Sequence, residues 1–334
     1  MRIRMKLTSM GIGCCILLTV ASVSIAWGTG ADSGGQCWTP QALAGRPGER
    51  AIRRTPYDRA IEPREGGVTL APVPPAQRGS IRSVRLPRGQ RLVALTFDLC
   101  ENAWEVSGYE GEIVDTLRRL GVKATFFASG KWLMDHRERA EQLIADPLFQ
   151  VGTHSWTHRN FRLLPPDDVR ADLALDLAAD ASVRRGLQEK ACFRPGARQR
   201  GESDRATLFR FPFGTCNAES LAAVNDAGLL AIQWDVPSGD PVKAATAEAI
   251  RLDVVARVKP GSIVVMHANG RGWHTAEALP LLIADLRKRG YEFATVGELL
   301  AKGEPVIADS CYELKPGDNA RYDKLFPERP RTAH

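Results

Sequence analysis

From residue 89 onward, the sequence alternates between short apolar runs and longer segments with helical spacing. The apolar runs cover residues 91–98, 122–129, 149–155, 206–212, 230–236, 261–267 and 291–296. Most are continuously apolar rather than alternating, as expected for parallel strands that are covered by helices. A strand–helix repeat sustained over about 215 residues restricts the fold to a barrel or an open doubly wound sheet.

The loop after the first strand helps to decide between these two architectures. No glycine-rich G-x-G-x-x-G or G-x-x-x-x-G-K-[ST] motif follows it, which weighs against a nucleotide-binding sheet. We therefore expect an α/β fold of the irregular (β/α)7 barrel type, with seven strands instead of eight. A hydrophobic content of 44% and a charged content of 25% suit an ordinary globular protein with a buried core.

The two ends of the chain lack this repeat. Residues 1–28 join the basic start MRIRMK to an apolar run ending in small residues, which predicts a secretory signal peptide, with an uncleaved membrane anchor as the alternative. Residues 29–88 are a Gly/Pro/Arg-rich N-terminal extension, interpreted as a linker or loosely packed arm. Residues 89–303 form the predicted domain and residues 304–334 a C-terminal tail.

The signal predicts export to the periplasm or the extracellular space, with membrane contact only through the signal or anchor. The net charge is +6, much of it from scattered arginines. No basic run is interleaved with aromatic residues in the manner of a base-stacking surface. We expect a solvated basic exterior and no nucleic-acid partner.

Candidate site residues, most of them polar, follow several predicted strands at their carboxyl ends. They are Asp98, His154, His158, Arg210, Gly214, Asp235, Asp240 and His267. In a parallel barrel these strand ends lie on one face around one mouth. His154 and His158 are four residues apart, so on a helical turn both imidazoles can reach one metal ion. Two surface histidines at this spacing by accident are the alternative.

The motifs TFD, HSWTH, RFPFG and MH, in this order, resemble those of the polysaccharide deacetylases, carbohydrate esterase family 4 with its NodB-type homology domain. The similarity covers about residues 90–303. It implies a metal-dependent hydrolase of linear amide bonds that removes acetyl groups from N-acetylated sugars of a cell-envelope or extracellular polysaccharide. The implied partner is a polysaccharide or oligosaccharide containing N-acetylhexosamine. The implied cofactor is a divalent metal, with zinc favoured over cobalt.

The resemblance also implies roles for individual residues. Asp98 resembles the family's general base, and Arg210 resembles the arginine that holds this base. His154 and His158 resemble the metal ligands. These roles agree with chemistry in which a metal polarises the acetyl carbonyl and a carboxylate takes a proton from water.

The remaining site residues follow from the same comparison. His267 resembles the general acid, and Asp240 the carboxylate that orients it. A histidine paired with a carboxylate stays protonated more readily, so it can protonate a leaving amine. Trp273 and Trp104 lie in predicted loops near the mouth and, with Gly214 of the arginine motif, are candidate substrate contacts.

The sequence departs from the family pattern at Leu99, where a second, metal-binding aspartate is expected. Leucine cannot bind a metal, and two histidines alone make a weak site. Asp98 could turn toward the metal as ligand, base or both, or Glu101 or another nearby acid could fill the gap. Loss of the metal would leave a sugar-binding pseudoenzyme. A metal-dependent barrel hydrolase of some other amide is a further alternative.

Five cysteines follow the signal, namely Cys37, Cys100, Cys192, Cys216 and Cys311. Disulfides are expected in an exported protein, and the odd number leaves one thiol over. If Asp98 and Arg210 touch, as the resemblance implies, Cys100 and Cys216 lie near each other. We predict a Cys100–Cys216 disulfide, with Cys192–Cys216 as its competitor. A metal-binding thiolate at Cys100 is disfavoured in an oxidising compartment.

Overall fold

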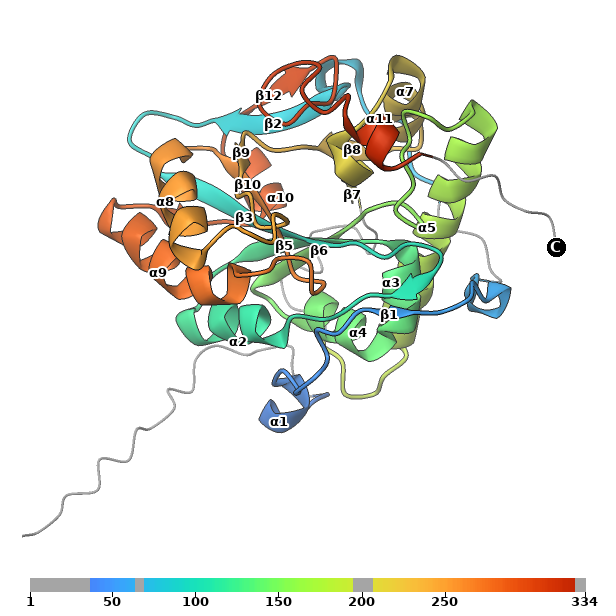
Figure 1. Cartoon of the computed structure of the whole chain (residues 1–334), viewed down its shortest axis with the longest axis horizontal. Helices are drawn as coiled ribbons and strands as arrows, with labels where there is room; N and C mark the ends of the chain where they lie inside the picture. The colour runs from blue at the N-terminus through green and yellow to red at the C-terminus, as the bar shows by residue number, and fades with distance from the viewer. Residues whose placement is uncertain (1–36, 64–68, 195–206, 328–334) are drawn as a thin grey trace, which may run out of the picture. The chain divides into compact units, whose positions relative to one another are not determined.

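A curved, mostly parallel sheet forms the centre of the computed structural model, which describes residues 37–63, 69–194 and 207–327 (Figure 1). In sheet order the strands are β12 (Glu304–Ala308), β2 (Ser80–Arg85), β8 (Leu230–Ile232), β7 (Leu208–Phe209), β6 (Phe149–Thr153), β5 (Ala124–Ala128), β3 (Leu92–Leu99), β10 (Ile263–His267) and β9 (Val236–Pro237). Neighbours from β2 to β9 are parallel, and β12 is antiparallel to β2.

Short strand pairings accompany this sheet. β11 (Glu292–Phe293) pairs with the first residues of β3, and β1 (Arg53–Arg54) forms a separate antiparallel pair with β4 (Glu105–Val106). A single bridge between Ser83 and Ser262 links β2 to the segment that enters β10. The α/β class and the barrel-like curl expected from the sequence are confirmed. In the described ranges, no ladder joins β9 to β12, so the barrel is incomplete.

The helices pack in two neighbouring groups (Figure 1). The first consists of α2 (Gly111–Leu120), α8 (Ala247–Arg257) and α9 (Thr275–Lys288), and the second of α3 (Gly130–Asp135), α4 (Arg137–Ala145), α5 (Pro166–Gln188) and α7 (Ala218–Asp226). The shorter elements are α1 (Pro40–Leu43), α10 (Val296–Leu300), α11 (Tyr322–Leu325) and the 3-10 turns η1 (Arg59–Ile61), η2 (Pro75–Gln77) and η3 (Pro212–Gly214). Each helix within the described ranges is too short or too polar to cross a bilayer.

The alternation of side chains along β3 positions the functional residues. Its odd-numbered residues from Val93 to Leu99 are buried in a core cluster shared with side chains of α2, α3 and α9. Successive strand residues point to opposite faces, so the even-numbered residues point to the concave side. There Thr96 and Asp98 both contact Arg210. The strand therefore delivers apolar groups to the helices and polar groups to the interior of the curl.

The predicted extension and tail both contribute to the sheet. β2 comes from residues 29–88 and β12 from residues 304–334, and the two strands pair with each other. The first part of the extension is also held, because the buried Arg139 donates hydrogen bonds to the carbonyls of Ala42 and Ala44. The interpretation of the extension as a linker or loose arm is therefore corrected for these described parts. Arg139 binds backbone carbonyls, and such contacts do not require apolar side chains at regular intervals. The sequence pattern therefore does not reveal them.

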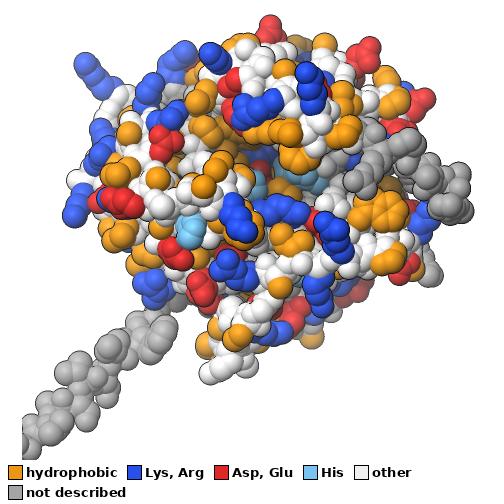
Figure 2. All heavy atoms as spheres, in the orientation of Figure 1, with side chains coloured by type: hydrophobic (Ala, Val, Ile, Leu, Met, Phe, Trp, Pro, Cys, Tyr) orange, Lys and Arg blue, Asp and Glu red, His pale blue; other side chains and the backbone are white. Residues whose placement is uncertain are grey.

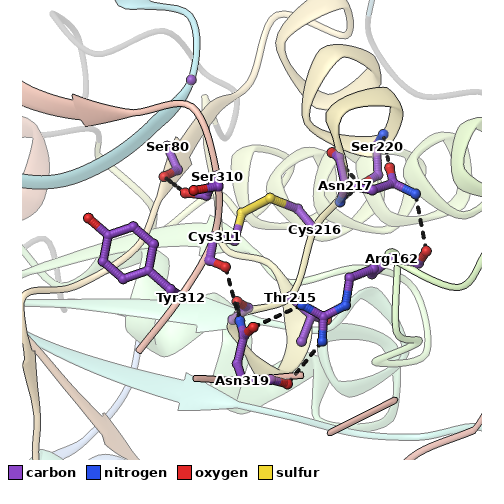
Figure 3. The surroundings of a disulfide bond; sticks show 12 residues. Ser80, Arg162, Thr215, Cys216, Asn217, Ser220, Ser310, Cys311, Tyr312 and Asn319 are labelled. Carbon is purple, nitrogen blue, oxygen red and sulfur yellow. Dashed lines mark hydrogen bonds between the residues drawn. A yellow bond between two sulfur atoms is a disulfide. The ribbon is translucent and has the colours of Figure 1, made fainter. Parts of the chain in front are cut away.

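Two disulfides join distant parts of the chain, Cys37–Cys192 and Cys216–Cys311. The predicted Cys100–Cys216 bond and its competitor Cys192–Cys216 are therefore wrong. Cys100 is a buried free thiol. The reason is visible in Figure 3, where the segment after β12 returns to the loop of the arginine motif and brings Cys311 to Cys216. Spacing along the sequence does not reveal such a tertiary contact.

Polar contacts hold the same C-terminal segment in place (Figure 3). Asn319 donates from its amide nitrogen to the carbonyls of Gly214 and Cys311. Arg162 donates to the side-chain and backbone oxygens of Asn319, at 2.8 and 2.9 Å. The segment is thus fastened to the arginine loop by both covalent and hydrogen bonds.

Replacing both Cys216 and Cys311 with serine is expected to lower the free energy of unfolding by about 2–5 kcal/mol. The bond spans 95 residues, so its loss returns conformational freedom to a long loop of the unfolded chain. Urea unfolding measures the change. The Cys37→Ser/Cys192→Ser double variant is the matched comparison, since it opens a disulfide between other loops. An unchanged stability without the Cys216–Cys311 bond would contradict the prediction.

Helix α5 carries three buried carboxylates at a spacing of four residues, Asp172, Asp176 and Asp180. Asp172 accepts a hydrogen bond from the backbone nitrogen of Trp156 at 2.6 Å, and Asp180 pairs with Arg184 at 2.8 Å. Burial, reinforced by the charges of Asp172 and Asp180, raises the pKa of Asp176 well above its usual range. Asp176 is therefore a candidate for a buried carboxyl group that stays protonated.

Asp176→Asn is expected to stabilise the protein increasingly as the pH rises. Below about pH 4 the wild-type carboxyl is protonated in both the folded and the unfolded chain. Above this pH only the unfolded chain ionises, because the folded pKa is raised, so wild-type stability falls by up to about 1.4 kcal/mol per pH unit. Urea unfolding at pH 5 and pH 8 tests this, and an equal difference at both would refute it. Asp180→Asn, which weakens the pair with Arg184, is the control and should destabilise.

Candidate active site

Asp98 and His267 lie side by side at the ends of two neighbouring parallel strands. β3 and β10 pair in register, with Asp98 opposite His267. Figure 2 shows a hollow on one face of the molecule, with histidine side chains visible inside it and Lys and Arg side chains on its rim. The structure therefore brings together two of the residues that the sequence analysis assigned to one site.

Arg210 holds Asp98 in a fixed orientation. Its Nη1 donates to Oδ1 of Asp98 at 2.8 Å, and its Nε and Nη2 donate to the carbonyls of Ile232 and Gln233. The guanidinium is fully buried, so this charge-assisted pair stabilises the carboxylate in a water-poor setting. The other oxygen of Asp98, Oδ2, lies 3.8 Å from Nε2 of His154. The pairing leaves Oδ2 on the side of the histidines.

His154 and His158 lie in the loop that follows β6. Nδ1 of the buried His154 is 2.7 Å from the carbonyl oxygen of Arg210. Because a carbonyl only accepts, Nδ1 carries the hydrogen, and Nε2 of a neutral ring keeps its lone pair for a metal. The two imidazole centroids are 4.8 Å apart. Both predicted metal ligands are thus adjacent.

The loops around these histidines contain strained backbone. Ser155, His158 and Phe213 have φ angles of 65°, 53° and 56°, in the left-handed region that residues with a Cβ seldom adopt. The Phe213 ring meets the His158 ring edge-on, with centroids 4.5 Å apart. Backbone strain of this kind concentrates at binding and catalytic sites, where the surrounding structure maintains it.

Cys100 lies beside the histidines as a free thiol, although the sequence led us to predict it in a disulfide and to disfavour a metal-binding thiolate. Its Sγ lies 3.5 Å from Nε2 of His154. Ligand atoms of Cys100, His154 and His158 lie within 4.8 Å of one another, whereas Asp98 forms such a group with Cys100 and His267. Burial favours the neutral thiol, but His158 and His154 outweigh this effect and hold the pKa of Cys100 well below its usual range. The ligand atoms of the predicted trio, Asp98, His154 and His158, do not all lie within 4.8 Å of one another.

Leu99 and Glu101 do not belong to this cluster. Leu99 is buried in the hydrophobic core. Glu101 accepts hydrogen bonds from Lys131 at 2.9 Å and from the backbone nitrogen of Ser107 at 2.7 Å. Burial opposes ionisation of Glu101, but hydrogen bonding with His136 and the charge of Lys131 lower its pKa to about 2. Its carboxylate is therefore committed to other partners, and the structure does not support Glu101 as the replacement ligand.

His267 is oriented by the buried Asp240. Nδ1 of His267 is 2.9 Å from Oδ1 of Asp240, and the backbone nitrogen of His267 donates to Oδ2 at 2.7 Å. The hydroxyls of Ser238 and Thr275 donate to the same carboxylate. Burial favours neutral His267, but the charge and hydrogen bond of Asp240 outweigh it and hold the pKa of His267 well above its usual range. With Nδ1 engaged, Nε2 is the nitrogen available as a proton donor.

The three predicted substrate contacts lie in different surroundings. Trp273 is 36% exposed, and its backbone nitrogen donates to the carbonyl of Asp240, which places it beside the His267 pair. Trp104 is 53% exposed in the loop after β3. Gly214 is buried with a φ of 61°, and a Cβ there would lie 2.6 Å from the Trp234 ring. Both tryptophans expose ring surface, whereas Gly214 is required by the local conformation.

An aromatic cluster from the C-terminal segment borders the strained loop. Phe326 stacks on Phe213 with centroids 4.2 Å apart, and Tyr322 lies 5.9 Å from Phe326. Phe326 is 43% exposed, so this cluster also presents ring surface. No motif in the sequence connects residues 322–326 with the histidines, because only the tertiary fold brings them together.

Comparison with known proteins agrees with the motifs. Residues 85–179 match the family model described as polysaccharide deacetylase. The peptidoglycan-N-acetylglucosamine deacetylase PgdA of Listeria monocytogenes is 28% identical over 247 residues, covering 72% of this chain and 47% of the relative. A chitooligosaccharide deacetylase of Bradyrhizobium is 29% identical, covering 63% of this chain and 91% of the relative. The chain thus spans about half the length of the first curated relatives it matches.

A solved structure of a pseudoenzyme of carbohydrate esterase family 4 from Bacillus anthracis has a similar fold. Its TM-score is 0.54 at 25% identity, and the match covers 68% of this chain and 70% of that protein. The ordered motifs, the curled sheet and these similarities lead to one assignment. Residues 85–179 are assigned to the polysaccharide deacetylase family, and the similar solved structures include members of carbohydrate esterase family 4.

Proposed function

We propose that this chain is a metal-dependent deacetylase that hydrolyses the N-acetyl groups of a polysaccharide containing N-acetylhexosamine. The single observation that carries the proposal is the juxtaposition of two oriented pairs, Asp98 with Arg210 and His267 with Asp240, at neighbouring strand ends. One pair supplies a proton acceptor and the other a proton donor. Amide hydrolysis needs both, because water must lose a proton and the leaving nitrogen must gain one.

The residues present fit a divalent metal. Nε2 of His154 is oriented by the bond from Nδ1 to Arg210, and His158 lies next to it. Nitrogen and sulfur donors at this spacing suit zinc, with cobalt as a substitute. A divalent cation held there would polarise the acetyl carbonyl and lower the pKa of the attacking water.

The side chains then divide the proton transfers between them. Oδ2 of Asp98 accepts the proton of the attacking water, while Arg210 holds this carboxylate in its orientation. Nε2 of His267 delivers a proton to the leaving amine, and Asp240 keeps the imidazole charged until it does so. The exposed rings of Trp273 and Trp104 are proposed to contact the sugars.

The substrate is proposed to be a cell-envelope or extracellular polymer, since the named relatives act on peptidoglycan and chitooligosaccharides. Two disulfides in the described part of the chain suit an oxidising compartment. The predicted signal peptide or anchor, residues 1–28, lies outside the described residues. Mass spectrometry of the mature N-terminus would test export and cleavage.

A sugar-binding pseudoenzyme is the second candidate. Leu99 occupies the position expected for a metal-binding aspartate, and a family pseudoenzyme is among the similar structures. The presence together of both proton-transfer pairs and both histidines favours the enzyme, because sugar binding alone does not require this set.

The deciding experiment measures acetate release from N-acetylglucosamine oligomers and from peptidoglycan. Wild type is assayed after chelation and after addition of zinc or cobalt, beside His154→Ala and the matched control His274→Ala, which alters an exposed histidine. We expect release that chelation abolishes, zinc restores and His154→Ala eliminates. Polymer binding with no acetate release under any metal would support the pseudoenzyme instead.

A further inference from the structure

We infer that the Cys100 thiolate is the third protein ligand of the metal, in place of the carboxylate that Leu99 cannot supply. The inference deepens the proposed function at the same site and rests on it for the role of the metal. It defines a donor set of two histidines and one cysteine, His154, His158 and Cys100. Three protein ligands with one open position are typical of catalytic zinc.

The direction of the Cys100 side chain follows from β3. Side chains alternate along the strand, so Leu99 enters the core and the residues on either side of it point to the concave face. Asp98 and Cys100 accordingly fall in one group of potential ligand atoms. The loss of a carboxylate at Leu99 is therefore accompanied by a metal-binding side chain at the next position, on the face where the histidines lie.

The distances suit direct coordination. With bonds of about 2.3 Å to sulfur and about 2.0–2.1 Å to nitrogen, ligand atoms of a tetrahedral zinc site lie about 3.3–3.8 Å apart. Sγ of Cys100 and Nε2 of His154 are already 3.5 Å apart. His158 completes a group whose ligand atoms all lie within 4.8 Å of one another.

The neighbouring acids are committed elsewhere. Asp98 is bonded to Arg210 and is needed as a proton acceptor, and Glu101 is bonded to Lys131. Cys100 is not lost to a disulfide, because the other described cysteines pair as Cys37–Cys192 and Cys216–Cys311. Of the groups near the histidines, the thiol is thus the one with no other part in the proposed reaction.

A thiolate ligand changes which metals the site prefers. Sulfur donors favour zinc, cobalt and cadmium over magnesium and manganese, which prefer oxygen. We therefore expect cadmium to compete effectively with zinc for this chain, and magnesium to compete poorly even in large excess.

The test uses the full-length protein loaded with cobalt(II), whose bond to a thiolate gives a charge-transfer band in the near ultraviolet. We expect this band at one cobalt per chain, and its loss in both Cys100→Ser and Cys100→Asp. Cys100→Ser should bind zinc at least about 100-fold more weakly, whereas Cys100→Asp, which restores a carboxylate, should retain one metal per chain. A cobalt-loaded wild type without the band, or wild-type zinc affinity in Cys100→Ser, would overturn the inference.

A second measurement needs no variant and so does not depend on the folding of one. Bound zinc should protect Cys100 from alkylation in the native protein, and a chelator should remove the protection. Equal alkylation with and without zinc, at a confirmed metal content, would contradict the inference. His274→Ala serves as the matched control, because it should keep the cobalt band that His154→Ala loses. Both measurements are independent of acetate release. A protein that shows the cobalt band but releases no acetate would therefore contradict the proposed function and leave the inference about Cys100 intact.

Discussion

Asp98→Asn is expected to lower kcat about 10²–10⁴-fold, the range associated with loss of a general base. The asparagine keeps the shape of the side chain and can still accept a hydrogen bond from Arg210, but it cannot take a proton from water. If Cys100, His154 and His158 hold the metal, this variant retains one metal per chain and its cobalt spectrum. Steady-state acetate release, measured beside metal content, separates the two possible roles of Asp98.

Asp235→Asn is the matched control for this variant. Asp235 is a partly buried carboxylate that accepts hydrogen bonds from the Ser262 hydroxyl and the backbone nitrogen of Ile263, at the end of β10 away from His267. It should change stability without a comparable loss of turnover. A fall in metal content in Asp98→Asn would identify Asp98 as a ligand, and unchanged kcat would exclude it as the base. Thermal unfolding shows whether Arg210, which loses its counter-charge, destabilises the variant.

Asp240→Asn is expected to move the alkaline limb of the kcat–pH profile to lower pH. In the wild type the Asp240 carboxylate raises the pKa of His267, so the imidazole stays protonated well above its usual range. Without this charge, burial lowers the pKa, and His267 is neutral and unable to donate at a pH where the wild type still works. We expect a loss of about 10–100-fold at pH 8 and a smaller loss at pH 6.

Glu277→Gln provides the comparison, because Glu277 pairs with the exposed His274 at 3.0 Å. It removes a carboxylate from a histidine of similar geometry that lies at the surface, and should leave the profile unshifted. If Asp240→Asn lowers kcat at every pH while the alkaline limb stays at the wild-type pH, Asp240 does not act by keeping His267 protonated. Such a result would assign Asp240 a purely positional effect.

The strand–helix repeat was predictable because its apolar runs are long and regular, and the structure confirms it. β2 and β12 were not predicted, because β2 lies within the Gly/Pro/Arg-rich extension and β12 is a partly exposed strand at the sheet edge, so neither forms a long apolar run. Their pairing joins residues 80–85 to 304–308, a contact with no local signature.

The site residues that lie at the ends of predicted strands could be predicted from the sequence. Asp98 and His267 sit opposite each other because parallel strands end together. Cys100 was assigned to a disulfide, although the period of two along β3 already placed it on the face of Asp98. The actual disulfide partners could not be predicted, because they depend on where the C-terminal segment returns.

The pairing of β2 with two later strands bears on how the chain completes its fold. Both neighbours of β2, β8 and β12, lie far downstream, and Cys216 finds its partner only at Cys311. A chain that stops at residue 303 therefore exposes one edge of its sheet and one reactive thiol. Synthesis of the last residues is what closes this edge.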